Sequence, residues 1–242
     1  MLFLTFTTGN YTKMTENLII NFKTVLAPHG HKLYIVCLDS RATDNLASYS
    51  ECEFIVLDSR DINPYTEIGS FASPSFNTIN SYKPVLIREF LDKYDEFYFV
   101  DCDLVFYQDP APFTVGYDML FQQDHETDEY RICTGNFYIR NTPEVVKFID
   151  NYKNTVCSSD ANIDNNNEQM ILNRIICEKY GTITNIPGMS AGVFPPAKFQ
   201  RGCDAIEAGW WRKDGVVVVH VNYRSGFESK KAALQSIGQW KV

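Results

Sequence analysis

The chain has 242 residues, a length that suits one large domain or one domain with a small subdomain. Apolar residues make up 45% of it and charged residues 21%, which is the composition of a globular protein with a packed core. The formal net charge is -8, and lysine and arginine are scattered along the chain, which argues against a protein that binds nucleic-acid phosphates.

The first part of the chain predicts strands that alternate with helices. Leu2–Thr7 is mostly apolar, too short for a membrane span and without a basic leader, so we expect a buried first strand. Apolar residues at helical spacing predict a helix over Lys13–Leu26. Short β-branched and apolar runs predict strands at Lys32–Leu38 and Glu53–Leu57. This alternation indicates an α/β fold with a mostly parallel central sheet flanked by helices.

The central part of the chain leads to an acidic motif. Arg60–Ser81 is irregular and polar, and it predicts a long loop. Lys83–Tyr94 has one apolar face and predicts a helix with Pro84 in its first turn. Glu96–Val100 is a strongly apolar strand, and it ends directly at Asp101-Cys102-Asp103.

The last part of the chain continues the same alternation. The sequence predicts strands at Tyr117–Gln122, Arg131–Arg140 and Val216–Val221, helices at Pro143–Tyr152 and Glu168–Tyr180, loops at Ser158–Asn167 and Pro187–Gly209, and a short C-terminal helix. No linker composition separates independent halves. We therefore expect a single domain over residues 1–242.

The cysteines and the N-terminus indicate a compartment. The chain has seven cysteines with no CxxC pair, which favours free, buried thiols in a reducing environment. With neither a leader nor a membrane span in the sequence, we expect a cytoplasmic protein. A bacterial or viral enzyme, or a domain of a longer chain, would fit this expectation.

Asp101-Cys102-Asp103 is the central candidate site. Two carboxylates leave the carboxyl end of a buried strand, which is where α/β sheets place their ligands. In an extended segment the side chains at i and i+2 point to the same side, so both can reach one cation. Carboxylates suit Mg²⁺ or Mn²⁺. An Asp-x-Asp triplet is common on protein surfaces, but burial of two like charges is costly without a cation or hydrogen-bond donors.

A second group follows the valine-rich strand. His220 ends this strand, and Asn222, Gly226 and Lys230 follow it. A lone histidine after a strand is usually a core or surface residue. A neutral imidazole can also complete a carboxylate-rich metal site. Gly226 would permit close approach of the backbone to a phosphate, and Lys230 would neutralise the phosphate charge.

Two polar segments are candidates for the reacting centre. Glu168 and Gln169 open an amphipathic helix, where polar residues either cap the helix or face a substrate. Thr134 and Gly135 interrupt a strand pattern, which indicates either a β-bulge or a place where substrate approaches the backbone.

The order of these motifs resembles the nucleotide-diphospho-sugar transferase family of GT-A glycosyltransferases, the family 77-like group, which is related to the family 8 of glycogenin and galactosyltransferases. The match runs from the first strand to about Lys231. Its pieces are Thr7–Tyr11, Lys83 at a predicted helix start, Asp101–Asp103, Asp109-Pro110, Cys133–Tyr138, Asn141–Pro143, Glu168–Asn173 and His220–Lys230.

The resemblance implies a GT-A type, Rossmann-like fold and a glycosyltransferase that uses a nucleotide-sugar donor, a UDP-sugar by default. It also implies a nucleotide-binding half over about 1–110 and a sugar and acceptor half over about 111–242. It implies Mn²⁺ or Mg²⁺ bound by Asp101, Asp103 and His220. The acceptor would be a glycan or a protein. The implied donor-binding residues are Thr7, Thr8, Gly9, Asn10, Tyr11, Lys83, Asp101, Cys102, Thr134, Gly135, Asn222, Gly226 and Lys230, and the implied catalytic residues are Glu168, Gln169 and Asp124.

The chain departs from the family at two places. The family's usual acid before Gln is Asp, and here it is Glu168. The spacing from His220 to Gly226 and Lys230 is longer than in family 8. If the enzyme retains configuration, the leaving phosphate can accept the acceptor's proton, and the resemblance leans this way. If the enzyme inverts, a carboxylate must act as the base, with Glu168 as first candidate and Asp124 as second.

Two other functions are compatible with parts of the sequence. Asp101–Val105 after an apolar strand resembles the nucleophile motif of haloacid-dehalogenase phosphatases, but the later Gly-Asp-x-x-x-Asp pattern is missing. A nucleotide-sugar-binding protein without transferase activity is the non-enzyme alternative, although all three expected metal ligands are present.

Overall fold

The structure is a computed structural model, and it describes residues 1–63, 73–124, 131–159, 167–212 and 214–242. Backbone contacts group the chain into two compact units. The first unit comprises Met1–Thr66, Tyr98–Phe113 and Pro195–Val242, and the second comprises Glu67–Phe97 and Thr114–Phe194. The expected division into halves at about residue 110 stays a prediction. The expectation of a single domain stays a prediction.

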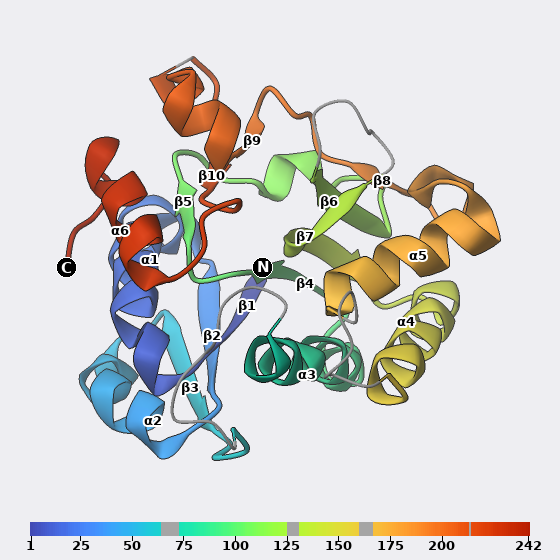
Figure 1. The fold of residues 1–242 in the computed structure, drawn as a ribbon, viewed down its shortest axis with the longest axis horizontal. Helices are drawn as coiled ribbons and strands as arrows, with labels where there is room; N and C mark the ends of the chain where they lie inside the picture. The colour runs from blue at the N-terminus through green and yellow to red at the C-terminus, as the bar shows by residue number, and fades with distance from the viewer. Residues whose placement is uncertain (64–72, 125–130, 160–166, 213) are drawn as a thin grey trace. The chain divides into compact units, whose positions relative to one another are not determined.

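The first unit opens with parallel strands joined by helices (Figure 1). β1 (Leu2–Thr7) pairs in parallel with β2 (Lys32–Cys37), which pairs in parallel with β3 (Ile55–Ser59). α1 (Thr12–Val25) connects β1 to β2, and α2 (Ser40–Leu46) connects β2 to β3 and packs against both. Parallel neighbours need such crossovers, because the chain must return to the same end of the sheet before the next strand.

A small second sheet also lies in the first unit. β10 (Val218–His220) pairs antiparallel with β5 (Leu104–Phe106) and parallel with β9 (Phe199–Arg201). All nine positions are buried, which explains why β10 is a run of valines rather than an alternating strand. The chain then ends with α6 (Phe227–Ser236). This sheet fixes the position of His220.

The second unit combines long helices with three strands. β6 (Met119–Gln123) pairs antiparallel with β7 (Ile132–Arg140) and parallel with β8 (Ala191–Val193). The β6–β7 register shifts between Phe121 and Gln122, so the predicted bulge at Thr134-Gly135 is present.

Three helices of the second unit pack on one another. They are α3 (Pro74–Leu91), α4 (Pro143–Cys157) and α5 (Glu168–Tyr180). Each begins after a residue whose side-chain oxygen accepts a backbone N–H of the first turn: Ser73, Thr142 and Asn167. These caps explain why the helices begin where they do, and α5 has the bounds that its sequence pattern predicts.

The larger sheet has seven strands in the order β3-β2-β1-β4-β7-β6-β8, where β4 is Glu96–Val100. Among the pairings given above for this sheet, three are parallel and the β6–β7 pair is antiparallel. The α/β class with a mostly parallel central sheet is therefore confirmed. No helix within the described residues is long and apolar enough to cross a membrane.

The largest error in a predicted boundary is the start of α3. The helix expected at Lys83–Tyr94 begins at Pro74, within the stretch assigned to a loop, so Lys83 lies in mid-helix and Pro84 is in the helix interior. Ser73 caps the helix and Pro74 occupies the first turn, where its missing N–H costs nothing. Polar residues of the first turns, such as Asn77 and Ser81, concealed this start in the sequence. Part of the expected loop and of the polar tract Ser158–Asn167 lies outside the described residues.

A further stretch also differs from the sequence-based elements. The stretch expected to be loop-rich, Pro187–Gly209, contains β8, β9 and a π-helical turn. The short 3-10 and π-helical segments are η1 (Gly9–Tyr11), η2 (Ala27–His29), η3 (Ala47–Glu51), η4 (Ala111–Phe113), η5 (Ile183–Asn185), η6 (Cys203–Glu207) and η7 (Trp210–Arg212).

Candidate functional site

Asp101 and Asp103 lie in the short turn between β4 and β5. β4 ends at Val100 and β5 begins at Leu104, and both strands are almost entirely buried. Asp103 is only 3% exposed, whereas Asp101 is 34% exposed. The turn therefore places one carboxylate inside the protein and the other at its surface.

Cys102 anchors this turn to the core. Its thiol donates to the carbonyl oxygen of Phe6 at 3.3 Å, and it lies 3.3 Å from the hydroxyl of Thr15 and 3.6 Å from that of Thr5. Burial raises the pKa of the Cys102 thiol to about 11, so the thiol is neutral at physiological pH. The geometry gives Cys102 a packing role, and its expected contact with the donor stays a prediction.

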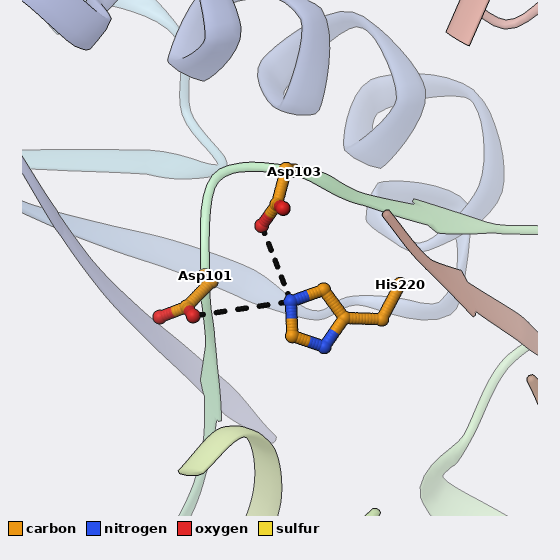
Figure 2. Close-up of side chains that lie close together, drawn as sticks. All are labelled: Asp101, Asp103 and His220. Atoms are coloured by element: carbon orange, nitrogen blue, oxygen red, sulfur yellow. Dashed lines mark ion pairs between the residues drawn. The ribbon is translucent and has the colours of Figure 1, made fainter. Parts of the chain in front are cut away.

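His220 meets the two aspartates because of strand register. β10 pairs antiparallel with β5, so His220 lies opposite Leu104, and the N–H of Val221 donates to the carbonyl oxygen of Asp103. Nε2 of His220 lies 3.3 Å from Oδ1 of Asp103 and 3.9 Å from Oδ2 of Asp101. Figure 2 shows the two carboxylates converging on this one ring nitrogen. The sequence expectation that these three residues form one cluster is thus met in the structure.

Lys230 adds a positive charge to the cluster. Its Nζ, on α6, lies 2.8 Å from Oδ2 of Asp103. Burial by itself would raise the pKa of the Asp103 carboxyl, but Lys230 and His220 outweigh burial and hold this pKa well below its usual range. Burial would likewise lower the pKa of Lys230, but Asp103 outweighs it and raises this pKa above its usual value. Both groups of this pair are therefore charged at neutral pH.

The side chains of the cluster offer ligand atoms that suit a divalent cation. Asp101, Asp103 and His220 each offer one ligand atom, and these atoms lie within 4.8 Å of one another. Two carboxylates and one imidazole make a hard to borderline donor set, which suits Mn²⁺ or Mg²⁺. The two carboxylates exceed the single ammonium group of Lys230 in charge, so a cation would balance the cluster.

The loop after His220 is held by close contacts. The side-chain oxygen of Asn222 accepts the N–H of Gly202 at 3.0 Å, and a Cβ at Gly202 would come within 2.9 Å of the Asn222 carbonyl oxygen. Asn222 therefore fastens the loop to the end of β9. Gly226 has φ 79° and ψ 161°, a conformation almost restricted to glycine, and it is the N-cap of α6. Donor contacts by Asn222 and Gly226 stay predictions.

The loop after β1 is tied to the turn that follows β2. Both side-chain oxygens of Asp39 lie 3.0 Å from the N–H of Gly9, and Asp39 is also the N-cap of α2. Arg41 packs over Gly9, where an added Cβ would lie 2.6 Å from its side chain, and it donates to Asn10 Oδ1 at 2.9 Å. Asp39 and Arg41 were not among the site residues predicted from the sequence. The signal that could have identified them is an acid that follows a buried strand, as in Asp101–Asp103.

The other residues of this loop differ in exposure. Thr7 and Thr8 are buried, and the Thr8 hydroxyl makes no hydrogen bond to the described part of the chain. Tyr11 packs edge-on against Phe227, and burial is the main reason that its pKa is raised. Beside this loop is a polar cavity of about 330 Å³, lined by Gly9, Asn10, Thr12, Lys13, Glu16, Arg41, Asn45 and Phe227.

A second polar cluster lies in the second unit. Nζ of Lys83 lies 2.9 Å from Oε1 of Glu168, and these side chains are 2% and 3% exposed. The hydroxyl of Thr134 donates to the same Oε1 at 2.8 Å, and the N–H of Thr134 donates to Oε1 of Gln169 at 3.0 Å. Tyr152 donates to Oε2 of Glu168. Sequence reasoning missed Tyr152, because it looks like any apolar-face residue of α4.

The remaining residues of the sequence-based site lie near the bulge. Asp124 is 6% exposed, and its Oδ2 lies 3.9 Å from Nη2 of Arg131. The N–H of Gly135 lies 3.5 Å from the sulfur of Cys133. The structure thus brings together Asp101, Asp103, His220 and Lys230 in the first unit, and Lys83, Thr134, Glu168 and Gln169 in the second. The expected roles of Asp124 and Gly135 stay predictions.

Comparison with known proteins identifies the class and then the family. The fold places Asp101, Asp103 and His220 near the carboxyl end of a sheet strand, which is where α/β proteins bind their ligands. The profile of the family described as nucleotide-diphospho-sugar transferase matches residues 29–234. The chain therefore belongs to this family, and it is a glycosyltransferase of the nucleotide-diphospho-sugar type. A search of curated proteins finds no match.

Solved structures agree on the fold. The galactosyltransferase LgtC, solved with donor and acceptor sugar analogs, superposes with a TM-score of 0.65 at 11% identity, over 99% of this chain and 95% of that one. A glycosyltransferase involved in glycosylation of the major capsid of PBCV-1 gives 0.57 at 12% identity, over 97% and 98%. The glycosyltransferase GlyE of Streptococcus pneumoniae TIGR4 gives 0.59 at 12% identity, over 97% and 59%. These similarities show a shared GT-A fold.

Proposed function

We propose that this glycosyltransferase is metal-dependent and moves a sugar from a UDP-sugar to a hydroxyl group of a glycan or protein acceptor. The observation that carries the proposal is the cluster of Asp101, Asp103 and His220, whose ligand atoms lie within 4.8 Å of one another. A buried Asp103 paired with Lys230 gives this cluster both the ligands for a cation and a positive charge for an anionic donor.

Mn²⁺ is the first candidate for the cation and Mg²⁺ the second, because the set contains an imidazole beside two carboxylates. When bound, the cation would supply electrostatic stabilisation to a departing nucleotide diphosphate. Lys230 would add to this stabilisation through its ammonium group, which already lies 2.8 Å from Asp103. Asp101, which is partly exposed, is the ligand that solvent and donor can reach.

The loop Thr7–Tyr11 is the proposed contact for the donor nucleoside. Several observations support this role. The loop follows the carboxyl end of a parallel strand, its Gly9 backbone is fixed by Asp39, and a polar cavity adjoins it. Asn10 and Asn45 in that cavity carry amide groups that can both donate and accept hydrogen bonds, which suits the edge of a nucleobase.

Retention of configuration is the proposed stereochemical course. A base for an inverting reaction needs a carboxylate oxygen that can take a proton from the acceptor. Oε1 of Glu168 already accepts from Lys83 and Thr134, and Oε2 accepts from Tyr152. These contacts favour a role for Glu168 in holding its neighbours over a role as base. Asp124 remains the candidate base if the reaction inverts.

Thermal unfolding in the presence of candidate donors tests the proposal. A ligand that binds only the folded state raises the melting temperature by mass action. UDP- and GDP-sugars are tested with and without Mn²⁺, on the wild type and on Asp103→Asn. We expect a shift that requires both the metal and one nucleotide class, and that Asp103→Asn loses.

Asp58→Asn is the matched control, because Asp58 is a half-buried, ion-paired aspartate of the same unit, on β3. Its donor response should equal that of the wild type. A wild-type shift that is independent of metal, or that survives in Asp103→Asn, would contradict the metal assignment. Donor binding without transfer to any acceptor or hydrolysis of the donor would favour the binding-protein alternative.

A further inference from the structure

The carboxylate of Glu168 is enclosed by hydrogen-bond donors from three elements. Lys83 reaches it from α3, Thr134 from β7 and Tyr152 from α4. All four side chains are at most 3% exposed. Donors of this kind hold a buried carboxylate in one orientation, because rotation would leave a charged oxygen without a partner.

Thr134 transmits this orientation to Gln169. Its hydroxyl donates to Glu168 at 2.8 Å, and its backbone N–H donates to Oε1 of Gln169 at 3.0 Å. A backbone N–H can donate only to the oxygen of an amide, so this contact determines which way the Gln169 amide points. The Nε2 group of Gln169 has no hydrogen-bond partner in the described part of the chain, and Gln169 is half-buried.

We propose that Tyr152 is a positioning residue for glycosyl transfer: through Glu168 and Thr134 it holds the Gln169 amide in one orientation, with the NH₂ group left free for a ligand. This inference rests on the proposed function. Tyr152 does not touch the substrate. It supplies the hydrogen bond to Oε2 of Glu168, and the alignment of Gln169 follows from the contacts of Glu168 and Thr134.

The length of the acidic side chain fits this arrangement. The side chain of Glu168 is long enough for its carboxylate to lie between Tyr152 on α4 and Lys83 on α3. Tyr152 is itself 1% exposed, so its ring packs in the core while its hydroxyl finds a charged acceptor.

Tyr152→Phe tests the inference, because it removes the hydroxyl and leaves the ring. We expect kcat to fall on the order of 10- to 100-fold, as for a misplaced contact group, while the KM for the donor stays within about threefold. Tyr138→Phe is the matched control. Tyr138 is also buried, and its hydroxyl donates to Glu96 and accepts from Arg140, both outside the cluster of Glu168.

A loss of kcat that is equal in both variants would mean a general effect of removing a buried hydroxyl, and it would overturn the inference. An unchanged kcat in Tyr152→Phe would do the same. If Tyr152→Phe fails to fold, Thr134→Val replaces it. That variant removes the hydroxyl joining Glu168 to Gln169 but keeps the backbone N–H, and the same fall in kcat with little change in KM is expected.

A measurement without substrate separates this inference from the proposed function. The side-chain amide signals of Gln169 are followed by NMR and assigned with Gln169→Leu. We expect them to shift and broaden in Tyr152→Phe and to stay unchanged in Tyr138→Phe. Unchanged Gln169 signals in Tyr152→Phe would overturn the positioning role whatever the donor. Absence of transfer by the wild type with every donor would instead contradict the proposed function.

Discussion

The two polar clusters of this protein differ in charge and in exposure. The cluster of the first unit has two carboxylates and one ammonium group, and Asp101 is 34% exposed. The cluster of the second unit has one carboxylate and one ammonium group, Glu168 and Lys83, and both are at most 3% exposed. The first is therefore net negative and reachable from solvent, whereas the second is neutral and closed.

This difference indicates that the two clusters have different roles. A net negative, accessible set of ligands is completed by a cation from outside. A neutral, closed set is complete without a ligand, and its contribution is to hold neighbouring groups in place. The residue types alone do not make this distinction, because both clusters combine acids with a lysine. The following predictions separate the two roles.

Removal of metal should have the largest effect, and only on the first cluster. Chelation should reduce transfer by more than about 100-fold, because the leaving diphosphate loses its main electrostatic stabilisation, and added Mn²⁺ or Mg²⁺ should restore it. On removal of the metal, the rates of amide hydrogen exchange should change around Asp103 and stay constant around Glu168. Full activity in the presence of a chelator would contradict the assignment of the first cluster.

Lys83→Met should be the most destabilising single change in the second cluster. It leaves the Glu168 carboxylate buried without its ion-pair partner, at a cost of about 3–5 kcal/mol in the free energy of unfolding. Urea denaturation measures this cost. Adding Glu168→Gln should recover part of it, because the uncompensated charge is gone.

Arg88→Met is the control for Lys83→Met. Arg88 is on the same helix, and its partners Asp92 and Asp150 are largely exposed, so its loss should cost less than about 1 kcal/mol. Equal losses for the two variants would show that the second cluster is no more than another ion pair.

Gly226→Ala should have an intermediate effect. The new side chain meets no neighbour, but φ 79° with ψ 161° is strained for any residue except glycine, so we expect a loss of about 1–3 kcal/mol. Because Gly226 begins the helix that carries Lys230, donor affinity should also fall. Gly238→Ala, also at positive φ but beyond the end of α6, should destabilise the protein without weakening its binding of the donor. Unchanged donor affinity in Gly226→Ala would mean that the conformation of this turn does not affect the first cluster, and it would contradict the prediction.

Tyr138→Phe should have the smallest of these effects, a change in how the free energy of unfolding depends on pH in the alkaline range. Burial, followed by its hydrogen bond to Glu96, raises the pKa of Tyr138 to about 12, above the ordinary value of about 10. The folded state therefore keeps this proton when the unfolded chain loses it. The stabilisation is fully present below about pH 10 and is lost as pH rises through about 12. Tyr138→Phe should be less sensitive over this range, and an identical alkaline profile would contradict the shift.

Features that depend on neighbours in the sequence were predictable. β4 and its acidic turn follow from an apolar run that ends in two aspartates, and α5 follows from its apolar spacing and the Asn167 cap. The start of α3 was not predictable from periodicity, because packing outweighs the polarity of Asn77 and Ser81.

Features that depend on contacts between residues far apart in the sequence were harder to predict. The sequence suggested His220 as a ligand, but the register of β10 on β5, which sets its distance from Asp103, comes from tertiary structure. Tyr152 had no signal of its own, because a buried tyrosine on an apolar helix face looks the same whether or not its hydroxyl meets a carboxylate. Asn222 was expected to touch the donor, and the structure adds a contact with Gly202 that spacing does not reveal.

The first unit is discontinuous in sequence, and this has a consequence for the order of events during synthesis. Asp101 and Asp103 leave the ribosome long before His220 and Lys230, and the larger segment of the second unit, Thr114–Phe194, is translated in between. Until β10 and α6 emerge, the nascent chain holds two neighbouring carboxylates without their imidazole and ammonium partners. Because such long-range pairing forms slowly, donor binding should be among the last properties that a newly made molecule acquires.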